Sequence, residues 1–298
     1  MNRLGFHHLA MIQALAATQS VSAAAKALGL TQSAVSHRMR EAERRVDAAL
    51  FYRDGRRVAL TRAGRRLALA ARTILNEAER AEFDLEQLAR GVDYVIRLCG
   101  ACYTPFHWFP PFYRRLRQDH PTYAAEVIVD VAEDPLTLLL ANVADIVLMI
   151  GEPVHAAVRG LPLLEDQLVA VMAVSHPLAE SKEITADDLA RYPYATYHTT
   201  PERELEYERV FATARKLPPE VISGGRTSVV LDLVAGGETL SIQPLLTVSR
   251  ACAARGLITR PVKGGLSVTW YAALRASDDA ASPPAVAVDL LRASIQAV

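Results

Sequence analysis

The sequence predicts an α+β protein of three parts: a winged helix-turn-helix over residues 1–60, a long linker helix over 61–91, and a two-lobed α/β domain over 92–298. Three observations support this division. A helix-turn-helix pattern lies near the N-terminus, an unbroken heptad pattern follows it, and strand and helix patterns alternate through the remainder.

The stretch Val21–Ser36 has the spacing of two short helices joined by a tight turn. Ala25 is small enough for a close helix crossing, Gly29 supplies the positive φ that ends the first helix, and Val35 points inward. A preceding helix over Phe6–Thr18 has an apolar face that would cover the pair. A simple helical hairpin with a solvated polar face would share this pattern, so the motif needs support from its neighbours.

The second helix of this motif has a polar leading end. Thr31 is expected to cap it, which leaves the first turn free to present donors and acceptors to DNA bases and phosphates. The predicted DNA-contacting residues of this helix are Thr31, Gln32, Ser33, Ser36, His37 and Arg38.

Two strand patterns after this helix form a hairpin signal. Leu50–Arg53 and Arg57–Leu60 flank the turn dipeptide Asp54-Gly55, so we expect a β-hairpin wing. Its arginines suit phosphate contact. The predicted contacts on the wing are Arg53, Arg56 and Arg57.

Charge is unevenly distributed although the whole chain is neutral. Residues 1–75 hold 13 Lys and Arg against 4 Asp and Glu, a net charge of +9, and the rest of the chain has a net charge of −9. A basic head favours a polyphosphate by counterion release. The expected partner is therefore double-stranded DNA, bound at one end of the protein.

A single long helix is expected from Thr61 to about Arg90. Its small and apolar residues alternate at spacings of four and three, which is the seam of a coiled coil. They are Leu67, Ala71, Ile74, Ala78, Ala81, Leu85 and Leu88. The helix could pack only on its own domain, but so regular a seam favours pairing of two chains, as a dimer or within a tetramer.

The rest of the chain alternates short strands with helices. Strands are expected at 94–100, 124–131, 145–150, 167–174, 194–197, 239–243, 257–262 and 267–275, and helices at 106–117, 135–141, 202–215, 227–235 and 284–297. Such βα units predict parallel sheets with helices on both faces. Two sets of these βα units would form two lobes: lobe I at about 92–163 and 268–298, and lobe II at about 164–267. The arrangement would be of periplasmic-binding-protein type, with a ligand crevice between the lobes.

Several classes of function are not expected. No long apolar run or signal sequence is present, so we expect a cytoplasmic protein without a membrane partner. Cys99-x-x-Cys102 with His107 has no nearby fourth ligand, and Cys252 stands alone, so we expect no metal, no cofactor and no disulfide framework. Ser175-His176 lies in a loop, and the sequence has no glycine-rich phosphate loop or acidic metal cluster, so we expect neither catalytic residues nor an enzyme. The remote alternative is an enzyme or solute-binding protein with an appended nucleic-acid domain.

The chain resembles the LysR-type transcriptional regulators along nearly its whole length. The phrases that carry the resemblance are Ser22–Leu28, Thr31–Ser36, Leu50–Arg53, Leu60–Gly64, Val234–Gly237 and Pro244. The resemblance implies a winged helix-turn-helix, dimers joined by linker helices and usually paired into tetramers, and a small-molecule inducer between the lobes. It also implies RNA polymerase as a partner. One departure is Asp47, where a glycine commonly ends the recognition helix; Asp tolerates the left-handed conformation, so we expect the turn to survive.

Two phrases are similar to the branch of the family that regulates methionine biosynthesis. They are Thr31–His37 in the recognition helix and Cys102–Trp108 after the first strand of the effector domain. This similarity implies homocysteine as the effector. The alternative is a regulator of another pathway that senses a different small carboxylate.

The resemblance places the inducer where the first strand of the effector domain meets its helix. There, Thr104-Pro105 has the pattern of a helix cap followed by the first helical residue, which would direct free amides toward a carboxylate. Other candidates follow the strand across the crevice or begin a later helix. The predicted ligand-binding residues are Cys102, Tyr103, Thr104, Tyr197, His198, Thr199, Arg203 and Thr227.

Overall fold

The structure is a computed structural model that describes residues 3–55, 57–101, 103–128, 134–198 and 206–296. The chain divides into two compact units. The N-terminal unit comprises residues 1–93 with 140–143, and the C-terminal unit comprises 94–139 with 144–298.

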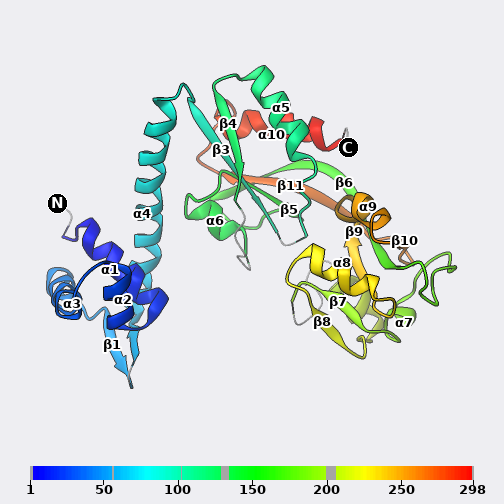
Figure 1. The fold of residues 1–298 in the computed structure, drawn as a ribbon, viewed down its shortest axis with the longest axis horizontal. Helices are drawn as coiled ribbons and strands as arrows, with labels where there is room; N and C mark the ends of the chain where they lie inside the picture. Colours follow the sequence, from blue (N-terminus) through cyan, green and yellow to red (C-terminus); the bar gives the residue numbers. More distant parts are fainter. Residues whose placement is uncertain (1–2, 56, 102, 129–133, 199–205, 297–298) are drawn as a thin grey trace. The chain divides into compact units, whose positions relative to one another are not determined.

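The N-terminal unit contains the predicted three helices, hairpin and long helix (Figure 1). Its elements in order are α1 (Phe6–Thr18), α2 (Val21–Ala27), α3 (Gln32–Val46), β1 (Phe51–Asp54), β2 (Arg57–Leu60) and α4 (Arg62–Leu88). The helix-turn-helix, the wing and the linker helix are therefore confirmed as secondary structure.

Local signals set the helix ends in this unit. Thr31 caps α3 by accepting a hydrogen bond from the Ala34 amide at 3.2 Å. Gly29 has φ +63° in the turn, and Asp47 ends α3 at φ 53°, so the expected left-handed Asp is confirmed. Ala25 and Val35 are buried between the helices. These residues hold α2 and α3 in the geometry that the sequence predicted.

The C-terminal unit contains a seven-stranded mixed sheet with the order β10-β6-β11-β5-β3-β4, and β9 also pairs with β6 (Figure 1). Its strands are β3 (Tyr94–Gly100), β4 (Tyr123–Val127), β5 (Ile146–Ile150), β6 (Val158–Ala173), β9 (Ser241–Pro244), β10 (Leu257–Pro261) and β11 (Ser267–Arg275). A separate parallel pair is β7 (Tyr194–Thr196) with β8 (Val221–Ser223).

The prediction of wholly parallel sheets is wrong for this unit. Strand β3 is parallel to β4 and β5, but β11 is antiparallel to both β5 and β6. The strand expected at 167–174 is the second half of the 16-residue β6, which pairs first with β11 and then with β9 and β10. Strand β6 thus belongs to both lobes. Whether the sheet is parallel, antiparallel or mixed depends on the direction of the strands that pair with β6, and the residues of β6 alone do not determine it.

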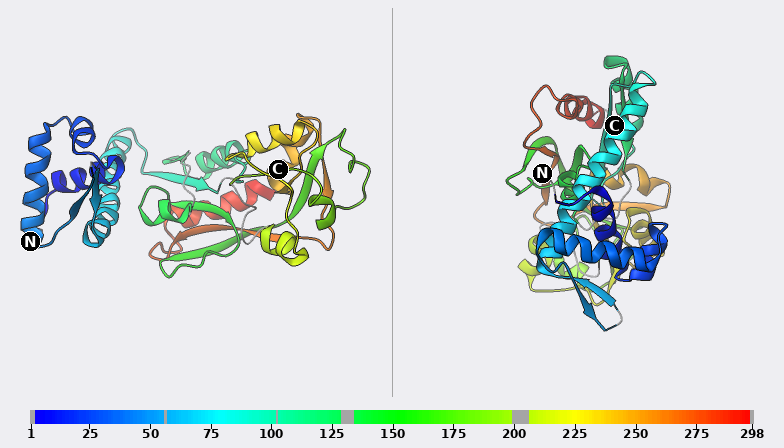
Figure 2. Two further views of the ribbon diagram at one scale, coloured as in Figure 1. Left: turned by 90° about the horizontal axis from the view of Figure 1, so that it is seen from below. Right: turned by 90° about the vertical axis from the view of Figure 1, so that its left-hand side faces the viewer.

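Helices cover the sheet. They are α5 (Phe109–Asp119), α6 (Leu136–Leu140), α7 (Ala186–Leu189), α8 (Thr227–Ala235), α9 (Leu245–Ala253) and α10 (Pro283–Gln296). Helix α10 packs beside α5 (Figure 2), and Trp108, Phe112 and Trp270 are buried in the core.

Within the predicted helix 202–215, the described part contains a π-helical turn at Tyr207–Ala212. None of the described helices combines the length and the apolar character that crossing a membrane requires.

Helix α5 begins later than predicted. The sequence suggested Thr104 as its cap, but the helix starts at Phe109 after the N-cap Trp108. Pro110 and Pro111 lie in its first turn. The N–H groups of a first turn have no acceptor within the helix, so proline loses no hydrogen bond there, and its fixed φ suits a helix. The expectation of a helix terminus at Thr104 is therefore wrong.

Candidate DNA-binding surface and effector site

The outward face of α3 carries the side chains predicted to contact DNA. Thr31, Gln32, Ser33 and His37 are exposed, and Ser36 and Arg38 are half-buried. The Thr31 and Ser33 hydroxyl oxygens lie 3.0 Å apart. The leading end of α3 thus presents uncharged donors and acceptors together with a histidine and an arginine, which can form hydrogen bonds to base edges and phosphates.

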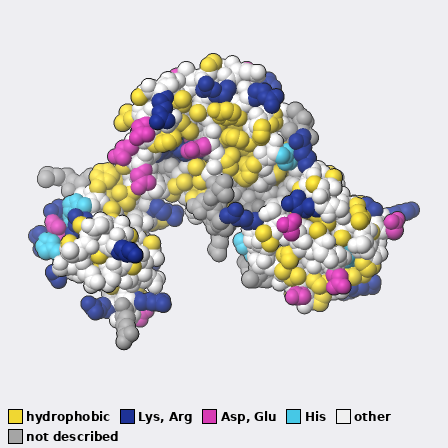
Figure 3. Space-filling model, viewed as in Figure 1, with side chains coloured by type: hydrophobic (Ala, Val, Ile, Leu, Met, Phe, Trp, Pro, Cys, Tyr) yellow, Lys and Arg dark blue, Asp and Glu magenta, His cyan; other side chains and the backbone are white. Residues whose placement is uncertain are grey.

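The wing adds exposed cations to this unit. Arg53 and Arg57 are exposed on β1 and β2, whose register pairs Arg53 with Val58 and Asp54 with Arg57. Arg56 lies outside the described residues. Figure 3 shows Lys and Arg side chains gathered around the wing end of the unit. Two strands with arginines beside their turn can contact phosphates on either side of a groove.

Glu43 joins the recognition helix to the wing, a role that the sequence analysis missed. Its Oε1 accepts hydrogen bonds from the Leu50 amide at 2.9 Å and the Phe51 amide at 3.2 Å. Charge-assisted bonds of this kind are about twice as strong as neutral ones. Glu43 therefore fixes the start of β1 relative to α3, and the only signal in the sequence was an acidic residue in a basic helix.

In the C-terminal unit, three predicted effector residues come together. The rings of Tyr103 and Tyr197 lie edge to face with centroids 6.1 Å apart, and the Tyr197 hydroxyl is 3.2 Å from the Thr227 hydroxyl. Tyr103 follows β3, Tyr197 follows β7, and Thr227 opens α8. Residues that follow the carboxyl ends of parallel strands form the usual position of a ligand crevice in α/β proteins.

Two further polar residues complete this cluster and were not predicted. The Tyr197 hydroxyl donates to the Gln243 side chain, which is buried at the end of β9. The Thr247 hydroxyl donates to the Tyr103 carbonyl at 2.7 Å. Their signal in the sequence was weak: each is one of several polar residues in a short strand or helix.

Thr104 takes part differently from the prediction. Its side chain is buried, and its hydroxyl donates to the Leu148 carbonyl on β5 at 3.3 Å. A Cβ on Gly100 would lie 2.5 Å from the Thr104 side chain, so Gly100 permits this close approach. Thr104 therefore fixes the loop after β3, and its hydroxyl is already engaged with the backbone.

The structure describes only one of the other predicted effector residues. His198 is exposed. Cys102, Thr199 and Arg203 lie outside the described residues. His107 is half-buried, and burial, together with the nearby Arg250, lowers its pKa. The arrangement of phenols, hydroxyls and one amide around Tyr197 can bind a polar ligand by hydrogen bonds.

Comparisons with known proteins extend over both units. Residues 6–65 match the bacterial regulatory helix-turn-helix protein domain of the lysR family, and residues 89–296 match the LysR substrate binding domain. The HTH-type transcriptional regulator MetR of Haemophilus influenzae is 29% identical over 280 residues, which cover 94% of this chain and 90% of that protein. The RuBisCO operon transcriptional regulator of Allochromatium vinosum is 27% identical over 261 residues, 88% of this chain and 86% of the relative.

Solved structures share the fold. CbnR, a LysR family transcriptional regulator, matches with a TM-score of 0.72 and 20% identity, over 98% of this chain and 99% of CbnR. The regulatory domain of MetR from N. meningitidis matches with a TM-score of 0.57 and 24% identity, over 68% of this chain and 94% of that domain. With a family domain matched over most of its length, this chain belongs to the LysR family of transcriptional regulators.

Proposed function

We propose that this chain regulates genes of methionine or sulfur amino-acid metabolism and that homocysteine is its effector. The observation that carries the proposal is the similarity to MetR, 29% identical across 94% of this chain. Because the similarity includes both units, it supports a shared DNA-reading head together with a shared sensing domain.

On the DNA side, we assign base contacts to the leading end of α3 and phosphate contacts to the wing. Gln32 and His37 are exposed on the face of α3 that carries Thr31 and Ser33, whereas Arg53 and Arg57 are exposed on the wing. Uncharged polar groups discriminate bases by their hydrogen-bond pattern, and arginines on a hairpin can bind the phosphates of any DNA sequence. Arg56 and Arg38 complete the assigned phosphate contacts, and Ser36 the base contacts.

On the effector side, we assign the site to the cluster around Tyr197. Arg226 is the N-cap of the nine-residue helix α8 and makes no side-chain capping hydrogen bond, and Thr227 is the first residue of this helix. A helix N-terminus with a neighbouring hydroxyl is suited to a carboxylate. The amino acid carboxylate of homocysteine would bind there, with Tyr103 and Tyr197 against its side chain.

The proposed mechanism is a change of geometry. Closure of the lobes on the effector would alter the packing of chains paired through α4, and with it the spacing of the DNA-reading heads and the bend in the promoter. Such a regulator would act in the cytoplasm and would contact RNA polymerase. An effector can drive this change only through a difference in affinity for the two arrangements.

A thermal-shift screen tests the effector assignment. At 100 times its dissociation constant, a ligand that binds only the folded state adds about 2.7 kcal/mol of stability, so L-homocysteine should raise the melting temperature by several degrees. Tyr197→Phe and Thr227→Val should remove most of the shift. Tyr113→Phe, at an exposed tyrosine on α5, is the matched control and should keep it. No shift with homocysteine at millimolar concentration would reject this effector.

A second candidate follows from the RuBisCO operon regulator, which is 27% identical over 88% of this chain. A regulator of another pathway would keep the same DNA-binding unit and sense a different small carboxylate. The same screen separates the two candidates if it includes organic acids without sulfur. A shift with such an acid that Thr227→Val removes would support this alternative over homocysteine.

A further inference from the structure

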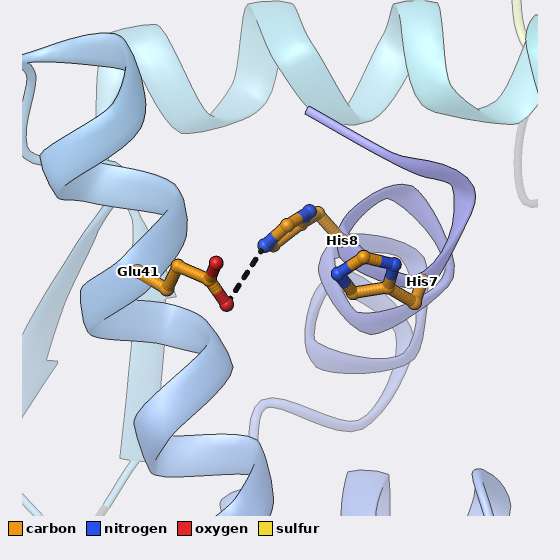
Figure 4. A group of neighbouring side chains, drawn as sticks. All are labelled: His7, His8 and Glu41. Carbon is orange, nitrogen blue, oxygen red and sulfur yellow. Dashed lines mark ion pairs between the residues drawn. The ribbon is translucent and has the colours of Figure 1, made fainter. Parts of the chain in front are cut away.

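We propose that His7, His8 and Glu41 form a binding site for a transition-metal ion, with Zn²⁺ as the best fit, between α1 and α3. The two histidines lie in the first turn of α1, and Glu41 comes from α3 (Figure 4). One ligand atom from each residue lies within 4.8 Å of the other two. This site is separate from the DNA-contacting residues and from the effector cluster.

His8 is the centre of the site. Its side chain is fully buried, and its Nε2 lies 3.4 Å from Oε2 of Glu41 without forming a hydrogen bond of good geometry. A buried nitrogen whose polar contact is this long is incompletely satisfied, and a bound ion would provide a shorter contact.

His7 and Glu41 can move toward a shared ion. His7 is exposed on the surface, its ring centroid lies 3.9 Å from that of His8, and Glu41 is only half-buried. Tetrahedral zinc with bonds of about 2.0–2.1 Å needs donor atoms roughly 3.3 Å apart. Binding would require these two side chains to rotate and close the remaining gap.

The donor set selects the class of metal. Two imidazoles and one carboxylate suit Zn²⁺, Ni²⁺ or Cu²⁺, whereas Mg²⁺ and Ca²⁺ prefer oxygen ligands alone. Three protein ligands leave a fourth position for water. Arg45 binds Oε1 of Glu41 at 2.6 Å and leaves Oε2 facing His8, so the arginine orients the carboxylate without occupying the ligand atom.

Metal binding requires one hydrogen bond to change. Nδ1 of His8 accepts the Gly5 amide at 3.1 Å, so the neutral ring carries its proton on Nε2. On binding, that proton moves to Nδ1, Nε2 coordinates the ion, and water takes over the Gly5 amide at the start of α1. The ion would then tie α1 to the helix that carries the predicted base contacts.

The test is a Zn²⁺ titration of the full-length chain after treatment with EDTA, in competition with a chromophoric chelator. We expect one bound ion per chain that depends on this cluster. Glu41→Gln and His7→Asn should each weaken it at least about tenfold. His155→Asn, at an exposed histidine in the C-terminal unit, is the matched control and should leave the affinity unchanged. His8 itself is left in place because its substitution would disturb the core.

Two readouts keep the result unambiguous. Unfolding curves in EDTA should show that both cluster variants retain the parent fold, so weaker binding reports a lost ligand. Bound Co²⁺ should lack the thiolate charge-transfer band that a site at Cys99 or Cys102 would produce. Unchanged affinity in both variants, or a thiolate band from the bound ion, would overturn the proposal.

Discussion

Individual side chains in the N-terminal unit serve either to join its elements or to face solvent. Glu43 joins α3 to the wing through two backbone amides, and Val35 is fully buried behind the recognition helix. Gln32 and His37 lie on the same helix and are exposed. Because the inward residues hold the helix in place, substitutions at the outward positions should change DNA binding with little effect on folding.

The assignment of base contacts to α3 and phosphate contacts to the wing can be tested by substitution. Gln32→Ala or His37→Ala should reduce discrimination against a mismatched base by about 1–3 kcal/mol, because each removes a base contact. Arg53→Ala or Arg57→Ala should weaken binding to every sequence and lower the slope of log affinity against log salt by about 1. Titrations of operator and scrambled DNA over a salt series measure both effects.

A matched control for the arginines is Arg191→Ala. This side chain is 70% exposed in the C-terminal unit, and its removal should change neither quantity. A uniform loss of affinity in all four N-terminal variants would contradict the assignment of base contacts to α3.

Three buried or half-buried histidines make stability depend on pH. Burial is the largest cause that lowers the pKa of His8, His107 and His176 from the ordinary value of 6.5. Near pH 6.5, these histidines therefore bind protons in the unfolded chain that they do not bind in the folded chain. The free energy of unfolding should be highest above this pH and should decrease as the pH falls below it.

Urea unfolding at pH 8 and pH 5.5, with EDTA present, measures this dependence. The midpoint should be lower at pH 5.5, and His176→Asn should reduce the difference between the two pH values. His155→Asn is the control, because that residue is exposed. An equal or higher midpoint at pH 5.5 would show that these histidines do not control stability in this range.

At the scale of elements, α4 has exposed apolar side chains along its heptad seam. Within the chain, Ile74, Leu85 and Leu88 are 44%, 66% and 49% exposed, whereas Ala71 of the same seam is fully buried. A 27-residue helix with this many exposed aliphatic side chains is stabilised by a second apolar surface. The heptad spacing favours the same helix of a second chain as that surface.

Substitution of the seam should change the oligomeric state. Leu85→Glu together with Leu88→Glu would place like charges in the seam, so we expect a shift from dimer toward monomer in sedimentation analysis and a loss of affinity for palindromic DNA. Leu217→Glu is the matched control, at a leucine that is 58% exposed outside α4. An unchanged sedimentation coefficient in the double variant would place the interface elsewhere.

At the scale of the C-terminal unit as a whole, β6 and a few side-chain contacts link the two lobes. The Thr247 hydroxyl on α9 donates to the Tyr103 carbonyl after β3, and the rings of Tyr103 and Tyr197 lie with their centroids 6.1 Å apart. These contacts connect the loop after the first strand to lobe II. The lobe closure proposed above would have to occur around these contacts or break them.

Removal of the Thr247 hydroxyl should destabilise this unit. Thr247→Val keeps the shape but leaves the buried Tyr103 carbonyl without its donor, at a cost of about 1–3 kcal/mol. Thr247→Ser restores a hydroxyl and should recover part of the loss, which makes it the control. Unfolding curves followed by tryptophan fluorescence measure the difference; equal stability of the Val and Ser variants would show that the bond contributes nothing.

The sequence by itself determined the elements whose signals are local. Thr31 and Asp47 mark the ends of α3, Gly29 marks the preceding turn, and Asp54-Gly55 marks the wing, because each acts on backbone within about one turn of itself. The family resemblance then placed Tyr103, Tyr197 and Thr227 as ligand candidates, and these three residues lie together. The assignment to the LysR family required nothing beyond such local phrases.

Only the tertiary structure decided contacts between residues far apart in the chain. Thr247 meets Tyr103 across 144 residues, and Gln243 meets Tyr197 across 46. Thr104 fitted a local cap pattern, yet its hydroxyl is taken by Leu148 on a neighbouring strand. His8 and Glu41 likewise meet through the packing of α1 on α3. Strand partners and helix packing follow from chain closure and burial over the whole unit, so no local pattern encodes them.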